Sequence, residues 1–286
     1  GNATAGPIAP QLWRDLGHEV IELYCEPDGR FPNHLPDPTV PKYMKDLQIE
    51  VLKHNADVGL GYDGDSDRVG AVDDKGRLIF ADTLMALFSK GVLTKNPQAE
   101  IYFDVKCSMA LPQQIKKYGG KPIMWKTGHS VLKAKMKQEG SPFSGELSGH
   151  LFFADDFFGF DDGIYASGRL LQMIDNENRP LSSLVDEIPS YPSTPEIRVD
   201  CADEKKFEIV QNLVNDFKDE NVVDIDGARV EFGDGWGLVR ASNTQPVLVL
   251  RFEAETETRL CEIVELFKKR LRQYPDVHFT KDQFEM

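Results

Sequence analysis

The chain has 286 residues and a hydrophobic fraction of 41%, which suits a globular protein of two or three domains. Its formal net charge of -14 excludes the global positive field of a nucleic-acid-binding protein. The four cysteines are widely spaced, which disfavours a disulfide framework or a zinc site, and no run of 18 apolar residues predicts a membrane span. We therefore expect a cytoplasmic protein whose partners include neither nucleic acid nor a membrane.

The N-terminal third alternates helical patterns with short apolar runs. We expect helices over 8–18, 41–55 and 82–91, and strands over 20–23, 57–62, 69–72 and 78–80. A Pro- and Gly-rich stretch at 27–41 is typical of an ordered surface loop, and 73–76 has the composition of a hairpin turn. The polar segment 94–100 marks a first domain boundary.

The remainder of the chain continues the alternation and then changes character. Strands are expected over 101–105 and 122–125, and helices over 109–118, 130–138 and 161–174. The Pro-rich stretch 189–195 marks a second boundary. Beyond it we expect a compact α+β module with strands at 196–199, 222–225, 229–232, 237–241 and 247–253, and helices at 203–219 and 256–273. The pattern before this boundary indicates α/β layers.

The first motif with clear chemistry is the loop DGDSDR, which directly follows the buried strand predicted at 57–62. Asp63, Asp65 and Asp67 alternate along it, and three such carboxylates would repel one another unless a cation neutralised them. Oxygen ligands suit a hard cation such as Mg²⁺. A solvated acidic turn is the alternative, but a calcium loop of the EF-hand type is excluded because Arg68 stands where that loop needs Gly. Arg68 could hold a phosphate beside the metal.

The second motif is GELSGH at 145–150, followed by an apolar run. Glu146 and Ser148 lie between glycines, so a carboxylate and a hydroxyl can reach vicinal hydroxyls of a sugar. An ordinary hairpin loop is an equally good interpretation of this motif taken alone.

The third motif is RASNTQP at 240–246, between two predicted strands. Its arginine, hydroxyl and amide side chains, together with free backbone N–H groups, favour a phosphate cradle over a polar hairpin. The residues concerned are Arg240, Ser242, Asn243 and Thr244.

A fourth feature is KTGH at 126–129, together with Lys106 at the end of a predicted strand. His129 could move a proton and Lys106 could balance phosphate charge, although a loop histidine is more often structural.

Taken in order, these motifs resemble the α-D-phosphohexomutase superfamily, in particular its bacterial phosphomannomutase/phosphoglucomutase branch. The similarity extends to GNA at 1–3, FPNH at 31–34, PDPT at 36–39 and FDDG at 160–163. It implies an α/β fold with two related α/β domains, each a mixed sheet flanked by helices, plus a smaller C-terminal α+β domain. These would be the second to fourth domains of the family: 1–96, metal-binding and without its first strand; 97–190, sugar-recognising; and 191–286, phosphate-binding.

The resemblance also implies a role for each motif. One Mg²⁺ would be bound by Asp63, Asp65 and Asp67, and Arg68, Lys106 and His129 would serve catalysis. The phosphosugar substrate would be held by Lys106, His129, Glu146, Ser148, His150, Arg240, Ser242, Asn243 and Thr244.

The family interconverts hexose 1-phosphates and hexose 6-phosphates through a phosphoserine and a hexose 1,6-bisphosphate intermediate, which also acts as activator. The serine lies in a TASHNP-like loop that this sequence does not contain. We therefore expect the missing N-terminal domain as a partner in cis, and no turnover by the chain alone. The alternatives are a catalytically inactive phosphosugar-binding fragment and a phosphoglucosamine mutase, although the latter usually has Gly in its cradle where Asn243 and Thr244 stand.

Overall fold

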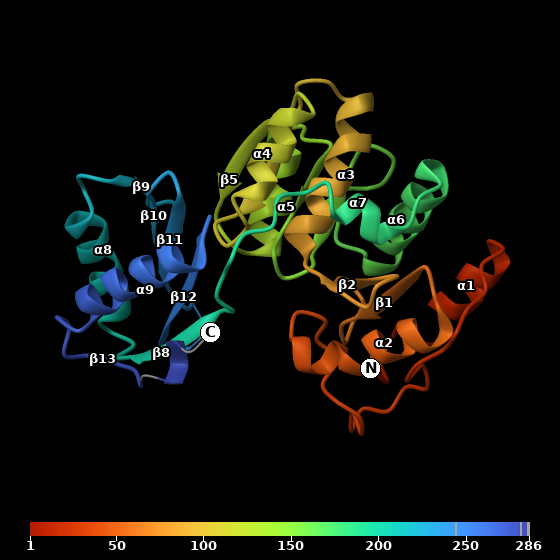
Figure 1. Ribbon diagram of the computed structural model, residues 1–286, viewed down its shortest axis with the longest axis horizontal. Coiled ribbons are helices and arrows are strands. Elements are labelled where there is room, and N and C mark those ends of the chain that lie inside the picture. The colour runs from red at the N-terminus through yellow and green to blue at the C-terminus, as the bar shows by residue number, and fades with distance from the viewer. Residues whose placement is uncertain (244, 281, 285–286) are drawn as a thin grey trace. The chain divides into compact units, whose positions relative to one another are not determined.

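The computed structural model describes residues 1–243, 245–280 and 282–284. The chain divides into two compact units, which are described separately here (Figure 1). Unit 1 comprises Gly1–Met124 and Gly128–Pro189, and unit 2 comprises Trp125–Thr127 and Ser190–Met286. Among the helices of the described residues, none is long and apolar enough to cross a bilayer.

The N-terminal part of unit 1 is built on a three-stranded antiparallel sheet of order β1-β2-β3. Its strands are β1 (Val58–Tyr62), β2 (Val69–Asp73) and β3 (Leu78–Ile79), and its helices are α1 (Ala9–Asp15) and α2 (Pro41–His54). Helix α2 buries Met44 and Val51 against β2. A Cβ atom at Gly61 would lie 2.8 Å from the sulfur of Met44, so the glycine lets α2 approach β1 closely.

The second part of unit 1 contains a four-stranded sheet of order β5-β4-β6-β7, in which β4 and β6 are parallel and β6 and β7 antiparallel. Its elements are α3 (Ala81–Lys95), β4 (Glu100–Asp104), α4 (Ala110–Lys117), β5 (Lys121–Trp125), α5 (His129–Glu139), β6 (Phe143–Gly145), β7 (Leu151–Phe153), α6 (Gly163–Glu177) and α7 (Leu181–Val185). Phe88 of α3 packs edge-on against Phe143 and Phe153, which anchors the helix to the sheet.

Unit 2 is a six-stranded sheet of order β13-β8-β12-β11-β10-β9, and its strand pairs are antiparallel. The elements are β8 (Ile197–Cys201), α8 (Lys206–Asp216), β9 (Asn221–Val223), β10 (Ala228–Glu231), β11 (Gly235–Ala241), β12 (Val247–Ala254), α9 (Glu257–Leu271), β13 (Val277–His278) and the 3₁₀ turn Asp282–Phe284. Helix α9 begins at the capping residue Thr256, whose side chain accepts from the N–H of Arg259. Its apolar stripe joins α8 in one core with the sheet.

The predicted α/β class with a smaller C-terminal α+β part is confirmed, whereas the strand predicted at 20–23 was wrong and four short elements, β6, β7, α7 and β13, were not predicted. Residues 20–23 form no strand: they pair with no strand of the described residues, and Val20 packs against the cluster around Trp13. Strands β6 and β7 were missed because three residues are too few to show a period. The domain boundary predicted after residue 96 lies between α3 and β4, and both proposed boundaries stay predictions.

Candidate functional site

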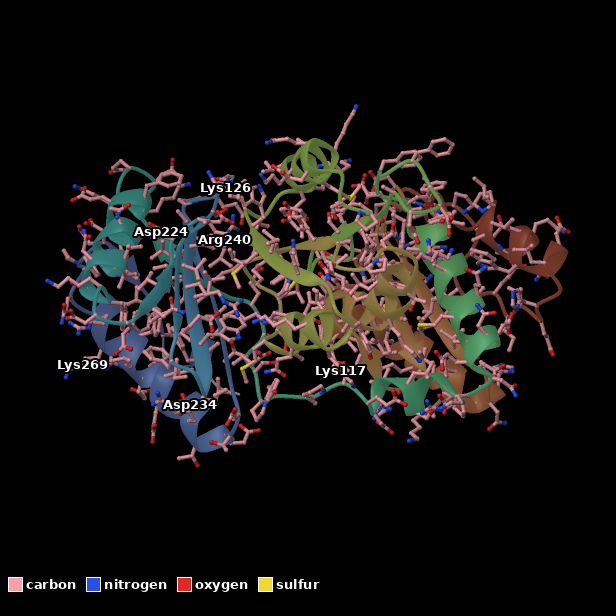
Figure 2. The ribbon with its side chains drawn as sticks, turned by 90° about the horizontal axis from the view of Figure 1, so that it is seen from above. Lys117, Lys126, Asp224, Asp234, Arg240 and Lys269 are labelled. Carbon is pink, nitrogen blue, oxygen red and sulfur yellow. The ribbon has the colours of Figure 1, made fainter. Side chains whose placement is uncertain are left out.

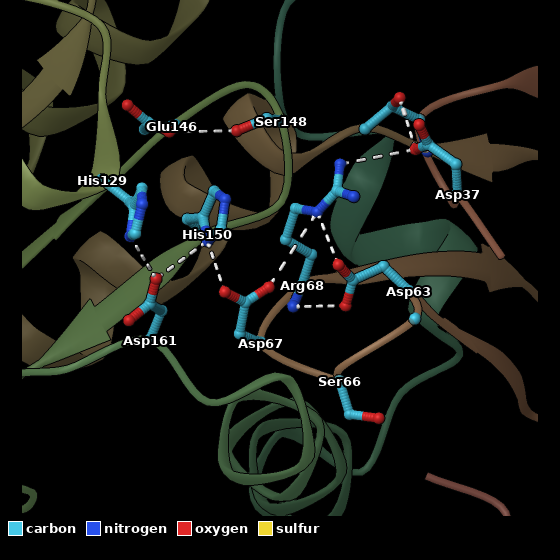
Figure 3. Close-up of polar contacts among 12 residues, drawn as sticks. Asp37, Asp63, Ser66, Asp67, Arg68, His129, Glu146, Ser148, His150 and Asp161 are labelled. Atoms are coloured by element: carbon cyan, nitrogen blue, oxygen red, sulfur yellow. Dashed lines mark hydrogen bonds and ion pairs between the residues drawn. The ribbon is translucent and has the colours of Figure 1, made fainter. Parts of the chain in front are cut away.

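The aspartate loop connects β1 to β2, and hydrogen bonds between its first residue, Asp63, and its last, Arg68, close it (Figure 3). Asp63 is buried, and its two carboxylate oxygens accept from the backbone N–H of Arg68 at 3.0 Å and from Arg68 Nε at 2.8 Å. The guanidinium also approaches Asp37, with Nη1 3.5 Å from Oδ1. The loop is therefore held in shape by charge-assisted contacts before any ligand arrives.

Ser66 takes a left-handed backbone conformation in this loop, with φ of 67°. That conformation is costly for a residue with a side chain. Here the Ser66 hydroxyl lies 2.7 Å from Thr4 Oγ1, and Thr4 Oγ1 donates to the carbonyl of Gly64 at 3.1 Å. The N–H of Gly163 donates to the Ser66 carbonyl at 2.9 Å. These bonds hold the turn in this conformation.

The three aspartates offer ligand oxygens that all lie within 4.8 Å of one another. Oδ1 of Asp67 is buried without a hydrogen-bond partner among the described residues. Burial, with the nearby charges of Asp63 and Asp65, raises the pKa of Asp67 to about 6, although His150 opposes the shift. An orphaned oxygen and mutual repulsion are what a bound divalent cation would relieve, so these residues fit a hard metal ion.

A second polar cluster adjoins the aspartates and is centred on Asp161 (Figure 3). Asp161 Oδ2 lies 2.9 Å from His150 Nδ1 and 3.2 Å from His129 Nδ1, and Oδ1 lies 2.5 Å from Lys133 Nζ. His150 Nδ1 is also 3.6 Å from Asp67 Oδ2, which connects the two clusters. Asp161 was not among the site residues predicted from the sequence. Its position in the FDDG motif was the available signal, but its partners come from distant segments.

Glu146 is buried in the 145–150 loop and its carboxylate is already engaged. Oε1 accepts from the N–H of Gly128, and Oε2 accepts from Ser148 Oγ at 3.1 Å. Burial and the nearby Asp104 raise the pKa of Glu146, while the Gly128 N–H and His150 act against the shift. The carboxyl and the hydroxyl therefore lie together, as the sugar-binding interpretation requires.

The same loop is hydrogen-bonded to the aspartate loop. Arg68 and His150 form an antiparallel bridge, and the N–H of Val69 donates to the carbonyl of Gly149 at 3.3 Å. Gly149 has a φ of 102°, and a Cβ atom there would lie 3.0 Å from the Val69 carbonyl, so this close approach requires glycine. The two loops are therefore joined directly through their backbones.

Lys106 follows β4 and is buried, with Nζ 3.7 Å from Asp104 Oδ2. The other oxygen of Asp104 accepts from the N–H of Leu147 at 3.1 Å. Asp104 thus connects the predicted substrate lysine to the 145–150 loop.

The predicted phosphate cradle lies in unit 2, where Arg240 belongs to β11. Figure 2 shows Arg240 and Asp234 toward opposite ends of that strand. Arg240 Nε and Nη2 lie 3.2 and 3.4 Å from the two oxygens of Asp226, which also accepts from the N–H of Thr127 at 3.0 Å. Asp226 holds the fork of Arg240 in one orientation and was not predicted from the sequence.

The turn after β11 is closed by Ser242, whose hydroxyl accepts from the N–H of Gln245 at 3.2 Å. Asn243 is exposed, and Thr244 lies outside the described residues. Lys206 Nζ, which pairs with Asp203 Oδ1 at 2.6 Å, also donates to the Gln245 carbonyl at 3.1 Å and so connects α8 to this turn. Sequence reasoning missed Lys206 because it comes from α8, far along the chain.

Comparisons with known proteins agree with this arrangement. Sequence models of the phosphoglucomutase/phosphomannomutase family match at three places: alpha/beta/alpha domain II at residues 1–76, alpha/beta/alpha domain III at 80–191 and the C-terminal domain at 196–269. The phosphomannomutase/phosphoglucomutase of Pseudomonas aeruginosa is 51% identical over 274 residues, which cover 95% of this chain and 59% of that protein. A phosphoglucomutase of Neisseria gonorrhoeae is 44% identical over 279 residues, or 96% of this chain and 60% of that protein.

A solved structure shows the same fold. It is a phosphoglucomutase/phosphomannomutase family protein from Burkholderia thailandensis, 43% identical, with a TM-score of 0.89 over 95% of this chain and 58% of that one. The chain therefore spans about three fifths of the length of these relatives.

Proposed function

The chain belongs to the phosphoglucomutase/phosphomannomutase family, and from this premise we propose that it supplies the metal-binding and phosphosugar-binding parts of a phosphohexomutase. The whole protein would interconvert hexose 1-phosphate and hexose 6-phosphate. The observation that carries the proposal is the hydrogen-bonded pair of loops in unit 1. It places three converging carboxylates and Arg68 beside His150.

In the proposed site Asp63, Asp65 and Asp67 hold one Mg²⁺. When bound, this ion would neutralise charge that develops on a transferred phosphoryl group. Arg68 is fixed by Asp63 at the edge of the carboxylate cluster, so its remaining guanidinium N–H groups can orient a phosphoryl oxygen. Lys106 adds a buried positive charge, and His129 and His150 offer ring nitrogens for proton movement at a sugar hydroxyl.

The sugar and its second phosphate would be held by the two remaining sites. The Glu146 carboxylate would accept a hydrogen bond from one hydroxyl of the hexose, and the Ser148 hydroxyl would donate one to a neighbouring hydroxyl. Arg240, Ser242, Asn243 and Thr244 would bind the phosphate that is not being transferred. Because Asp226 fixes the guanidinium in advance, less side-chain entropy is lost when the phosphate binds.

The reaction also requires a phosphoserine, which we propose a further domain of the same polypeptide supplies. That serine would donate its phosphoryl group to the sugar phosphate and form hexose 1,6-bisphosphate. The bisphosphate would then reorient in the site and return its other phosphoryl group to the serine. We also retain three domains at 1–96, 97–190 and 191–286, and a cytoplasmic location, as parts of this proposal.

Magnesium titration of the chain tests the metal site directly. Asp65 is exposed, and its side chain makes no hydrogen bond or ion pair with the described residues, so Asp65→Asn should weaken Mg²⁺ binding by calorimetry with an unchanged melting temperature. Asp57→Asn is the matched control, because it removes an equally exposed carboxylate just before β1. Unchanged Mg²⁺ affinity in Asp65→Asn would rule out the ligand assignment.

A coupled assay with glucose and mannose 1-phosphates tests the reaction. It compares this chain with a polypeptide that spans the full length of the relatives. Turnover only by the longer protein supports the proposal, and turnover by neither points to a phosphosugar-binding protein without mutase activity.

A further inference from the structure

The rings of His129 and His150 are stacked, with centroids 5.0 Å apart and planes 15° from parallel. Both rings present Nδ1 to the same carboxylate oxygen, Asp161 Oδ2, at 3.2 and 2.9 Å. The two imidazoles come from different elements, since His129 begins α5 and His150 precedes β7. A single carboxylate therefore sets the orientation of both rings.

Asp161 is well suited to this position. Its side chain is only 7% exposed, and Phe152 bridges its backbone to the end of the sheet. Lys133 lies one turn after His129 on α5 and places Nζ 2.5 Å from Asp161 Oδ1. Burial alone would raise the pKa of Asp161, but the contacts with His150 and Lys133 outweigh it and lower that pKa. The carboxylate stays ionised at neutral pH.

An ionised carboxylate can only accept hydrogen bonds, so the nitrogen atoms that face it must carry hydrogen. His150 Nδ1 and Asp161 Oδ2 are both buried, and neither forms a hydrogen bond of regular geometry with the described residues. Their 2.9 Å separation is an ion-pair distance, and the next carboxylate oxygen, Asp67 Oδ2, lies 3.6 Å from the same nitrogen, so Asp161 is the nearer acceptor for a hydrogen on Nδ1. For a neutral imidazole with hydrogen on Nδ1, the lone pair lies on Nε2. The carboxylate thus decides which nitrogen of each ring can take a proton.

We propose that Asp161 is a positioning residue that holds His129 and His150 in the Nδ1–H tautomer and so reserves Nε2 of each ring as a proton acceptor toward the sugar hydroxyls. The role of Nε2 as a proton acceptor rests on the proposed mutase function, whereas the assignment of the tautomer rests only on the contacts of Asp161. Asp161 does not touch the substrate in this scheme. It acts through the two imidazoles, as second carboxylates do in other histidine sites.

The competing explanation is that Asp161 is only the anion of a structural ion pair with Lys133. Lys133→Met separates the two, because it removes that ion pair and leaves both histidine contacts in place. Asp155→Asn is the control for loss of a buried carboxylate. The Asp155 side chain is 1% exposed and pairs with both terminal nitrogens of Arg169, and it lies in the same loop as Asp161.

Imidazole ¹⁵N NMR of the chain, at a pH where the rings are neutral, reads the tautomers without any need for activity. Variants His129→Gln and His150→Gln assign the two ring signals among the six histidines. We expect Nδ1–H for both rings in the unaltered chain, in Lys133→Met and in Asp155→Asn, and loss of that preference in Asp161→Ala. Asp161→Glu should restore it at least for His150. An Nε2–H tautomer in the unaltered chain, or no change in Asp161→Ala, would overturn the inference.

Kinetics of the full-length protein provide the second readout. Asp161→Ala should lower kcat about 10- to 100-fold with little change in KM, whereas Lys133→Met should retain most of its activity. An equal loss of kcat in both variants would assign Asp161 to the ion pair alone. If the unaltered full-length protein has no mutase activity, the proposed function fails, and the tautomer measurement still decides the role of Asp161.

Discussion

Gly163 is the position where a single methyl group should damage the metal site from a distance. It is the first residue of α6, and its N–H donates to the carbonyl of Ser66 in the aspartate loop. A Cβ atom at Gly163 would lie 2.7 Å from the Arg68 carbonyl oxygen and 2.9 Å from that of Ser66. Both neighbours are backbone atoms, so Gly163→Ala must displace α6, the loop or both.

The size of the effect follows from that overlap. Ordinary contact begins near 3.4 Å, so the backbone must give way by up to ~0.7 Å. Overpacking of this kind typically costs about 1–3 kcal/mol. At about 2–4 °C per kcal/mol for a unit of this size, the melting temperature should fall by roughly 2–12 °C. If Mg²⁺ binding requires the displaced loop to return to its original conformation, and that return costs about 1.4 kcal/mol of the binding free energy, the Mg²⁺ affinity falls about tenfold.

Thermal unfolding and Mg²⁺ calorimetry measure the two consequences in the same preparation. Gly168→Ala is the matched control on the same helix. Its Cβ would meet Trp13 at 3.4 and 3.6 Å, which is ordinary contact, so it should be neutral or stabilise by up to about 1 kcal/mol. A Gly163→Ala protein with the melting temperature and Mg²⁺ affinity of Gly168→Ala would refute the reasoning.

Three further predictions test other contacts. Arg240→Lys should weaken hexose-phosphate binding about tenfold by calorimetry, because an ammonium group cannot reproduce the guanidinium fork held by Asp226; equal affinities would contradict this. Asp161→Asn should have a lower free energy of unfolding than the unaltered chain at pH 7, measured in urea. The contacts of Asp161 outweigh its burial and lower its pKa, so its stabilisation is lost as the carboxylate protonates, and the difference should shrink below pH 3.8. A difference that stays constant with pH would contradict this. Asp74→Ala should cost about 1–2 kcal/mol in the same assay, since Asp74 accepts from the N–H and hydroxyl of Ser182 at 2.7 and 2.9 Å, and Asp57→Asn should cost little.

Local chemistry made the aspartate loop and most elements predictable from the sequence. The loop follows the five-residue strand pattern VGLGY, of which only Gly59 is buried in the structure, and it contains all its own carboxylates, so Asp63, Asp65 and Asp67 could be identified together. Their convergence within 4.8 Å agrees with that reasoning. The long helices were found because their apolar residues recur over several turns, as in α9, whereas the five-residue helix α7 was missed.

What the sequence could not show depends on contacts between distant segments. Asp161 approaches His129 across 32 positions, and Asp226 approaches Thr127 across 99. Apart from the FDDG motif around Asp161, nothing in the neighbouring sequence indicates the partners of these two aspartates. The same holds for residues 20–23, whose local pattern suits a strand; only Val20 packs on the Trp13 cluster, and the segment has no strand partner among the described residues.

The bridge between Arg68 and His150 has a consequence for anyone who wishes to redesign this protein. Because each loop supplies backbone hydrogen-bond partners to the other, 63–68 and 145–150 form a single transplantable part. A chimera that exchanges only one of the two loops would pair it with a loop from another protein. The contact at Gly149 would then be mismatched, because there is no room for a side chain next to the Val69 carbonyl. Exchange of substrate preference between relatives should therefore succeed with the two loops carried together and fail when either is carried alone.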